Sequence, residues 1–174
     1  DDEAWAFDPT ELAEPRRLPA GVRRTADGRE TQLWTLPDPD PLTDTEAAVE
    51  VLRDAIRESA ASLPDADVAV AFSGGVDSAL VAALVDGPCY VAGFPDSHDV
   101  EAARTAADAM GVDLTVVELT HAAIERAVPD IVAATGRTNA MDVQISLPLY
   151  LVAERVAADG HDHLAVGQGA DELF

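Results

Sequence analysis

The sequence predicts an α/β fold in which helices cover both faces of a doubly wound parallel sheet. Short apolar runs rich in valine and alanine alternate with longer segments of helical periodicity, which is typical of right-handed β–α–β units. Glycines and prolines separate these segments. A chain of 174 residues with 48% hydrophobic residues is long enough for one such domain and a short additional segment.

Four strands and five helices are expected after the first 42 residues. The expected strands lie near residues 67–72, 89–93, 113–118 and 162–166. The expected helices lie near residues 43–63, 76–86, 97–110, 120–135 and 142–159. Thr43 or Asp44 is expected to cap the first helix. Before it, Pro37, Pro39 and Pro41 alternate with aspartates in a linker that cannot be helical.

Charge and composition exclude several classes of partner. The chain has 33 acidic and 11 basic residues, all of the latter arginine, and a net charge of −22. Nucleic acids and anionic membranes are poor partners for so acidic a surface. No apolar run approaches the ~20 residues of a membrane span, and a single cysteine, Cys89, suits a reducing cytoplasm. The acidity and the lack of lysine are typical of proteins from halophilic archaea, so we expect folding to need salt.

The most informative segment is Ser73–Ser78, here called the glycine loop, which follows the strand at 67–72 and opens a helix. Backbone N–H groups and the helix dipole at such a turn make an anion cradle. A Walker-type loop is excluded because it needs a lysine. Asp77 would repel a phosphate unless Mg²⁺ lay between them, so the loop predicts a Mg-nucleotide. An ordinary strand-to-helix turn is the simpler alternative, but the flanking serines and Asp77 favour phosphate.

The glycine loop resembles the PP-loop of the ATP pyrophosphatases, enzymes that split ATP between its α and β phosphates. A second segment, Gly167–Phe174, resembles the Gly-Glu-Gly-Ala-Asp-Glu-Leu-Phe segment of asparagine synthetases. Leu147–Ala153 and Val91–Asp99 are similar to a helix and a strand of the same family. The resemblance covers about residues 60–174 and implies the adenine nucleotide alpha hydrolase fold.

The resemblance also implies roles for individual residues. Asp77 and Asp171 would be the two magnesium carboxylates, and Gln168 would stand near the activated substrate. The residues that would bind ATP are Phe72, Ser73, Gly74, Gly75, Val76, Asp77, Ser78, Ala92, Val166 and Gly167. Gln168 replaces the glutamate that is common in the family, and glutamine cannot act as a base. The amidation half-reaction is therefore more affected by this change than the adenylation.

The resemblance further implies that the chain is a fragment of a longer protein. Residues 1–42 would be the remnant of a glutaminase-like domain, with a β tail at 18–34, and the Pro/Asp linker. Residues 43–174 would be the ATP-binding synthetase domain, truncated at its carboxyl end. Cys89 lies in a strand-like run, so it is interpreted as a buried structural thiol. Any glutaminase activity would then lie outside this chain.

The predicted function is that of an asparagine-synthase-like ligase, which would adenylate aspartate or a related acid with Mg-ATP and then form an amide with ammonia. Two alternatives stay open: another PP-loop adenylating ligase, and a non-catalytic nucleotide-binding module. The expected partners are small molecules, namely ATP, the acid, and ammonia or glutamine, and the oligomeric state stays open, with a homodimer among the candidates. The turn from Arg137 to Asp142 faces the same sheet edge and could touch the substrate.

Overall fold

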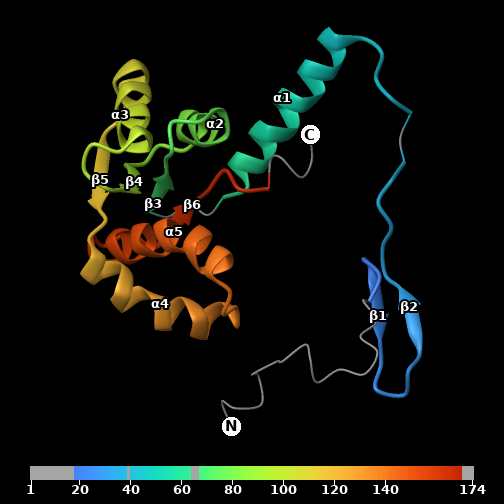
Figure 1. The fold of residues 1–174 in the computed structure, drawn as a ribbon. Helices are drawn as coiled ribbons and strands as arrows, with labels where there is room; N and C mark the ends of the chain where they lie inside the picture. Colours follow the sequence, from blue (N-terminus) through green and yellow to red (C-terminus); the bar gives the residue numbers. More distant parts are fainter. Residues whose placement is uncertain (1–17, 39, 64–66, 170–174) are drawn as a thin grey trace. The chain divides into compact units, whose positions relative to one another are not determined.

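The computed structural model describes residues 18–38, 40–63 and 67–169. The chain divides into two compact units, Asp1–Leu52 and Arg53–Phe174, and each is described by itself (Figure 1). Asp171 and Pro39 lie outside the described residues. Among the described residues, no helix combines the length and the apolar character that crossing a membrane requires.

The first unit contains a hairpin. Strands β1 (Val22–Arg24) and β2 (Glu30–Gln32) pair antiparallel, with Val22 opposite Gln32. Arg24 forms an ion pair with Glu30 across the two strands. The predicted β tail is therefore confirmed as a hairpin, while its origin in a glutaminase domain stays a prediction.

Helix α1 (Thr45–Ala61) begins where the linker ends. The Asp44 carboxylate accepts hydrogen bonds from the backbone N–H groups of Glu46 and Ala47, at 2.9 and 3.4 Å, which confirms Asp44 as the cap. The described linker residues before it are not helical, as expected. The helix is amphipathic but has no fully buried residue.

The second unit is built on a four-stranded parallel sheet. Its strands are β3 (Val68–Ala71), β4 (Cys89–Gly93), β5 (Leu114–Glu118) and β6 (His163–Ala165), in the order β5-β4-β3-β6. The chain moves outward from β3 to β5 and then returns to the other side of β3. This reversal places the topological switch point, where ligands bind in open α/β sheets, at the carboxyl end of β3.

Helices cover both faces of the sheet, which confirms the doubly wound fold. Helices α2 (Val76–Leu84) and α3 (His98–Met110) lie on one face, and α4 (His121–Thr135) and α5 (Ala140–Ala158) on the other (Figure 1). Side chains alternate accordingly: Val70 and Val91 pack in the core beside α2 and α3, while Ala69 and Tyr90 pack against α5.

Capping residues set the ends of the helices. The side chains of Ser97, Thr120 and Asn139 accept N-terminal hydrogen bonds of α3, α4 and α5. Helices α3 and α4 end at Gly111 and Gly136, both in the left-handed conformation. Helix α5 begins two residues earlier than predicted because Asn139 rather than a later residue caps it.

Candidate functional site

The glycine loop lies at the carboxyl end of β3 and is held by hydrogen bonds centred on Ser78. The buried Ser78 hydroxyl donates to the Gly75 carbonyl at 3.0 Å and accepts the Ser73 N–H at 3.2 Å. The Ser73 and Ser78 hydroxyl oxygens are 3.2 Å apart, and the Gly75 N–H donates to Ser73 Oγ at 3.4 Å. The serines therefore shape the loop as well as offering polar groups to a ligand.

Gly74 is a position where only glycine fits. Its φ is +80°, in the left-handed region. A β carbon there would lie 2.9 Å from the Ala103 Cα atom of α3 and 3.0 Å from the Ala102 carbonyl oxygen. The loop thus packs closely on α3 at the carboxyl edge of the sheet, next to the N-terminus of α2.

Gly167 brings the segment after β6 against the first turn of α2. A β carbon on Gly167 would lie 3.0 Å from Asp77 Cβ and 3.0 Å from the Ser78 backbone nitrogen. Two segments that are about ninety residues apart in the sequence therefore meet beside Asp77. This contact assembles the two motifs that the sequence singled out.

The other residues expected to bind ATP or its substrate lie around the contact between Gly167 and Asp77. Phe72 is fully buried at the end of β3, whereas the Val76 side chain is 80% exposed. Ala92 and Val166 line two different cavities, on either side of β3. Gln168 is exposed in the turn after Gly167.

The described residues contribute one carboxylate, that of Asp77, to the expected metal site. Among the described residues, no group of three or more His, Cys, Asp or Glu side chains could hold a metal ion. Asp77 is a half-buried carboxylate on the first turn of α2, beside the glycine loop. This position suits an ion such as Mg²⁺, whose remaining ligands are mostly water molecules and phosphate oxygens. The second expected carboxylate, Asp171, lies outside the described residues.

A cavity that the sequence did not predict lies at the carboxyl ends of β4 and β5. Its volume is about 660 Å³. The residues that line it come from both strand ends and from α3, α4 and α5: Ala92, Gly93, Phe94, Ser97, Asp99, Leu119, Ile124, Val128, Val132, Thr138, Ala140, Val143, Gln144, Leu147 and Pro148. The sequence signal for it is Gln144, a polar residue among the apolar residues that α5 contributes to the lining.

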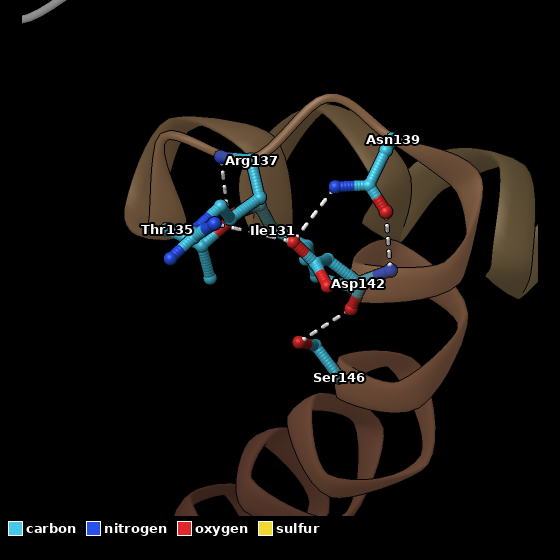
Figure 2. Close-up of polar contacts among 6 residues, drawn as sticks. All are labelled: Ile131, Thr135, Arg137, Asn139, Asp142 and Ser146. Atoms are coloured by element: carbon cyan, nitrogen blue, oxygen red, sulfur yellow. Dashed lines mark hydrogen bonds and ion pairs between the residues drawn. The ribbon is translucent and has the colours of Figure 1, made fainter. Parts of the chain in front are cut away.

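The turn between α4 and α5 borders this cavity through Thr138 and Ala140. Figure 2 shows how the turn is held: the Asp142 N–H donates to Asn139 Oδ1 at 2.9 Å, and the Asn139 amide donates to Asp142 Oδ2 at 2.7 Å. Arg137 Nη1 lies 3.6 Å from the same Asp142 oxygen. Arg137 and Asp142, the candidates for substrate contact, are thus paired with each other.

Other titratable clusters lie at the opposite edge of the sheet. Tyr90 donates its hydroxyl to Asp159 at 3.0 Å, and His161 Nδ1 lies 2.8 Å from Asp67 Oδ1. Burial, and then the charge of Asp113, raise the pKa of the Cys89 thiol, so this cysteine is an unreactive core residue, as predicted. These groups are structural and lie at the amino ends of the strands, away from the glycine loop.

Comparison with known proteins identifies the family. Residues 48–174 match the asparagine synthase family. The chain belongs to the asparagine synthase family. The match covers both the glycine loop and the segment after β6, the two parts that the structure brings together beside Asp77.

Two curated relatives show how much of such a protein this chain represents. It is 32% identical over 111 residues to a Methanocaldococcus jannaschii protein described as a glutamine-hydrolysing asparagine synthetase, covering 62% of this chain and 20% of the relative. It is 25% identical over 161 residues to the glutamine-hydrolysing asparagine synthetase B of Escherichia coli. That match covers 79% of this chain and 28% of the relative. The chain thus matches between a fifth and just over a quarter of the length of these relatives.

Solved structures resemble this domain more distantly. A glutamine-dependent NAD⁺ synthetase from Acinetobacter baumannii, solved with ADP, has a TM-score of 0.45 and 20% identity, covering 82% of this chain and 29% of that one. An ammonia-dependent NAD synthetase from Campylobacter jejuni, solved with a nitrate ion, has a TM-score of 0.43 and 15% identity. That match covers 70% of this chain and 56% of the synthetase chain.

Proposed function

We propose that this asparagine synthase domain binds Mg-ATP at the glycine loop and adenylates the carboxylate of aspartate or a related acid. One observation carries the proposal: the packing of Gly167 on Asp77 and Ser78 joins the two family motifs at the carboxyl end of β3. That end of the sheet is where doubly wound folds bind their ligands.

In the proposed reaction, a carboxylate oxygen of the acid attacks the α-phosphorus of ATP. The bond from that phosphorus to the oxygen bridging it to the β-phosphorus breaks, and pyrophosphate leaves with the bonding electrons. Ammonia then attacks the acyl carbon of the adenylate and loses a proton, and AMP leaves. Backbone N–H groups of the glycine loop would bind the phosphates, and Phe72, Ala92, Val166 and Gly167 would contact the adenosine, largely through their main chains.

Asp77 and Asp171 would hold the magnesium ion. Bound there, Mg²⁺ would neutralise the charge that grows on the pyrophosphate. Gln168 would orient the activated acid by hydrogen bonds, because it cannot accept a proton as a base. The nitrogen would come from solution or from a glutaminase domain.

The Asp77→Asn substitution tests this proposal in the full protein. Replacing the carboxylate removes an interaction needed for the transition state, so acid-dependent pyrophosphate release should fall by about 100-fold or more. Asp108→Asn is the matched control, because Asp108 is exposed on α3, away from the loop, and it should leave the rate unchanged. Unchanged pyrophosphate release by Asp77→Asn would contradict the proposal.

A non-catalytic nucleotide-binding module is the second candidate, and the exposed glutamine at position 168 favours it. Such a module would bind ATP without activating an acid. Exchange of labelled pyrophosphate into ATP separates the two, because only an enzyme that forms an acyl-adenylate reversibly catalyses that exchange in the presence of its acid. Acid-dependent exchange would exclude the non-catalytic module.

A further inference from the structure

A hydrogen bond at the amino end of the sheet ties the turn before β6 to the start of β3. His161 Nδ1 lies 2.8 Å from Asp67 Oδ1. An ionised carboxylate only accepts hydrogen bonds, so the Nδ1–H of the imidazole is the donor. The Asp67 carbonyl oxygen also accepts from the backbone N–H groups of Asp162 and His163, at 3.2 and 3.3 Å. Asp67 thus holds this turn with both its side chain and its main chain.

The His161 ring is fixed on a second side by β4. It packs edge-on against Tyr90, with the ring centroids 6.0 Å apart and the ring planes at 74°. Tyr90 is buried, and its hydroxyl donates to Asp159, which also pairs with Arg155. The imidazole is 16% exposed, whereas the Asp67 side chain is 63% exposed. The ring is therefore held in one orientation, from which its Nδ1 reaches the more exposed carboxylate.

Strand β6 is short, so its register depends on how the turn before it is held. It has three residues and lies at the edge of the sheet, where, in the described part of the chain, it pairs with β3 alone. The residue of β6 that faces Val68 is His163, directly after the turn that Asp67 holds. A slip of one residue would turn Leu164 away from the core that it shares with Tyr90.

The register of β6 decides where Gly167 lies. Gly167 follows the last residue of β6 by two positions, and a β carbon on it would be 3.0 Å from Asp77 Cβ. One residue of a strand spans about 3.3 Å, so a slip of one position would move this segment by more than that contact allows. The histidine bond and the contact with Asp77 therefore lie at the two ends of one short segment, residues 161–167.

We propose that His161 is a positioning residue for the ATP site. Its hydrogen bond to Asp67 fixes the register of β6, and β6 in turn holds Gly167 against Asp77. This inference rests on the proposed binding of ATP at the glycine loop. It adds a residue that touches neither ATP nor the acid and acts on the site from the opposite end of the strand.

Four variants of the full protein separate the hydrogen bond from the ring packing and from charge. His161→Phe keeps an aromatic ring against Tyr90 but removes the donor. Asp67→Ala removes the acceptor carboxylate and keeps the backbone carbonyl. His161→Asn is the conservative variant, because its side-chain amide can donate to Asp67. Asp162→Ala is the matched control for Asp67→Ala, since it removes an exposed carboxylate from the same turn.

Hydrogen exchange of the ligand-free protein measures how firmly β6 is held. The backbone amides of residues 163–167 should exchange about fivefold faster in His161→Phe and Asp67→Ala, because the loss of one hydrogen bond favours local opening by about that factor. His161→Asn and Asp162→Ala should stay within about twofold of the unchanged protein. Equal exchange in all five proteins would overturn the inference. A uniform rise over the whole domain would indicate a general loss of stability and would also overturn it.

The affinity for ATP, measured by isothermal titration, tests the consequence at the site. The Kd should rise about fivefold in His161→Phe and in Asp67→Ala and recover in His161→Asn. It should rise no further in the double variant, since both single changes break the same bond. If the unchanged protein binds ATP and these variants bind it equally well, the inference is wrong and the proposed function stands. If the unchanged protein does not bind ATP, the proposed function fails, and the role of His161 at that site fails with it.

Discussion

Gly167 and Asp77 lie so close that a β carbon on the glycine would be 3.0 Å from the β carbon of the aspartate. The first residue belongs to the segment after β6 and the second to the first turn of α2. Their contact leaves little room for a side chain at position 167. The position of the second motif beside the glycine loop therefore depends on this glycine.

Gly167→Ala should weaken ATP binding by about tenfold, which corresponds to 1.4 kcal/mol. The added methyl group would push the segment after β6 away from Asp77 and Ser78. Isothermal titration with ATP measures the effect. Gly160→Ala is the control: Gly160 has a φ of +97° and open space around its Cα, so that variant should lose stability but keep its ATP affinity. Equal affinities of the two variants would show that the contact does not shape the nucleotide site.

Ser78→Ala should lower both the free energy of unfolding and the affinity for ATP. The variant leaves the Gly75 carbonyl and the Ser73 N–H without their hydroxyl partner, a loss of about 1–3 kcal/mol. Urea unfolding measures the stability. The control is Ser62→Ala, because the exposed Ser62 hydroxyl bonds to the nearby Ser59 carbonyl and contributes little. If Ser78→Ala behaves like Ser62→Ala in both measurements, the serine network does not hold the loop.

The stability of the protein should rise with salt. A net charge of −22 makes the folded chain repel itself and ATP, and the screening length falls from about 10 Å at 0.1 M salt to about 3 Å at 1 M. We therefore expect the Tm, followed by circular dichroism, and the ATP affinity to increase from low to molar KCl. A Tm that does not change over this range would contradict the halophilic interpretation.

The pH range of stability should reflect Asp159 and Tyr90. A hydrogen bond from Arg155 lowers the pKa of Asp159, so its contribution is present above the ordinary carboxyl pKa and is lost as pH falls through and below about 4. Burial, and then the bond to Asp159, raise the pKa of Tyr90, so stability should fall as pH rises above about 10.

Asp159→Asn should flatten the acid side of this profile, because the amide does not titrate. Unfolding by urea at a series of pH values measures the profile. Asp162→Asn is the control, since Asp162 is exposed in the same turn, and it should keep the acid-side slope of the unchanged protein. An unaltered slope in Asp159→Asn would show that this carboxylate does not govern acid stability.

Much of the fold follows from local sequence patterns. Apolar runs bounded by glycine and proline, and the capping residues Ser97 and Thr120, place the strands and helices within a few residues. The strand order does not follow from such patterns, because the position of β6 beside β3 depends on packing between segments far apart in the sequence. The sequence pattern also predicts that α1 has an apolar face, but it does not predict which surface packs against that face.

One part of the candidate site could be predicted from the sequence and another part could not. The glycine loop is evident from its residues because Gly74 must adopt a positive φ and Ser78 must close the turn. The cavity that Gln144 borders was not predicted, because it forms from strand ends and three helices whose packing no short motif encodes. The same packing shows that Ala92 and Val166 line separate cavities.

The central claim is that the glycine loop presents ATP for cleavage at its α-phosphorus. Turnover of ATP labelled in the α-phosphate by the full protein, with an accepted acid and Mg²⁺, tests this claim most directly. The account predicts labelled AMP together with an equal amount of pyrophosphate, and loss of both products in Asp77→Asn. Labelled ADP with inorganic phosphate would contradict it.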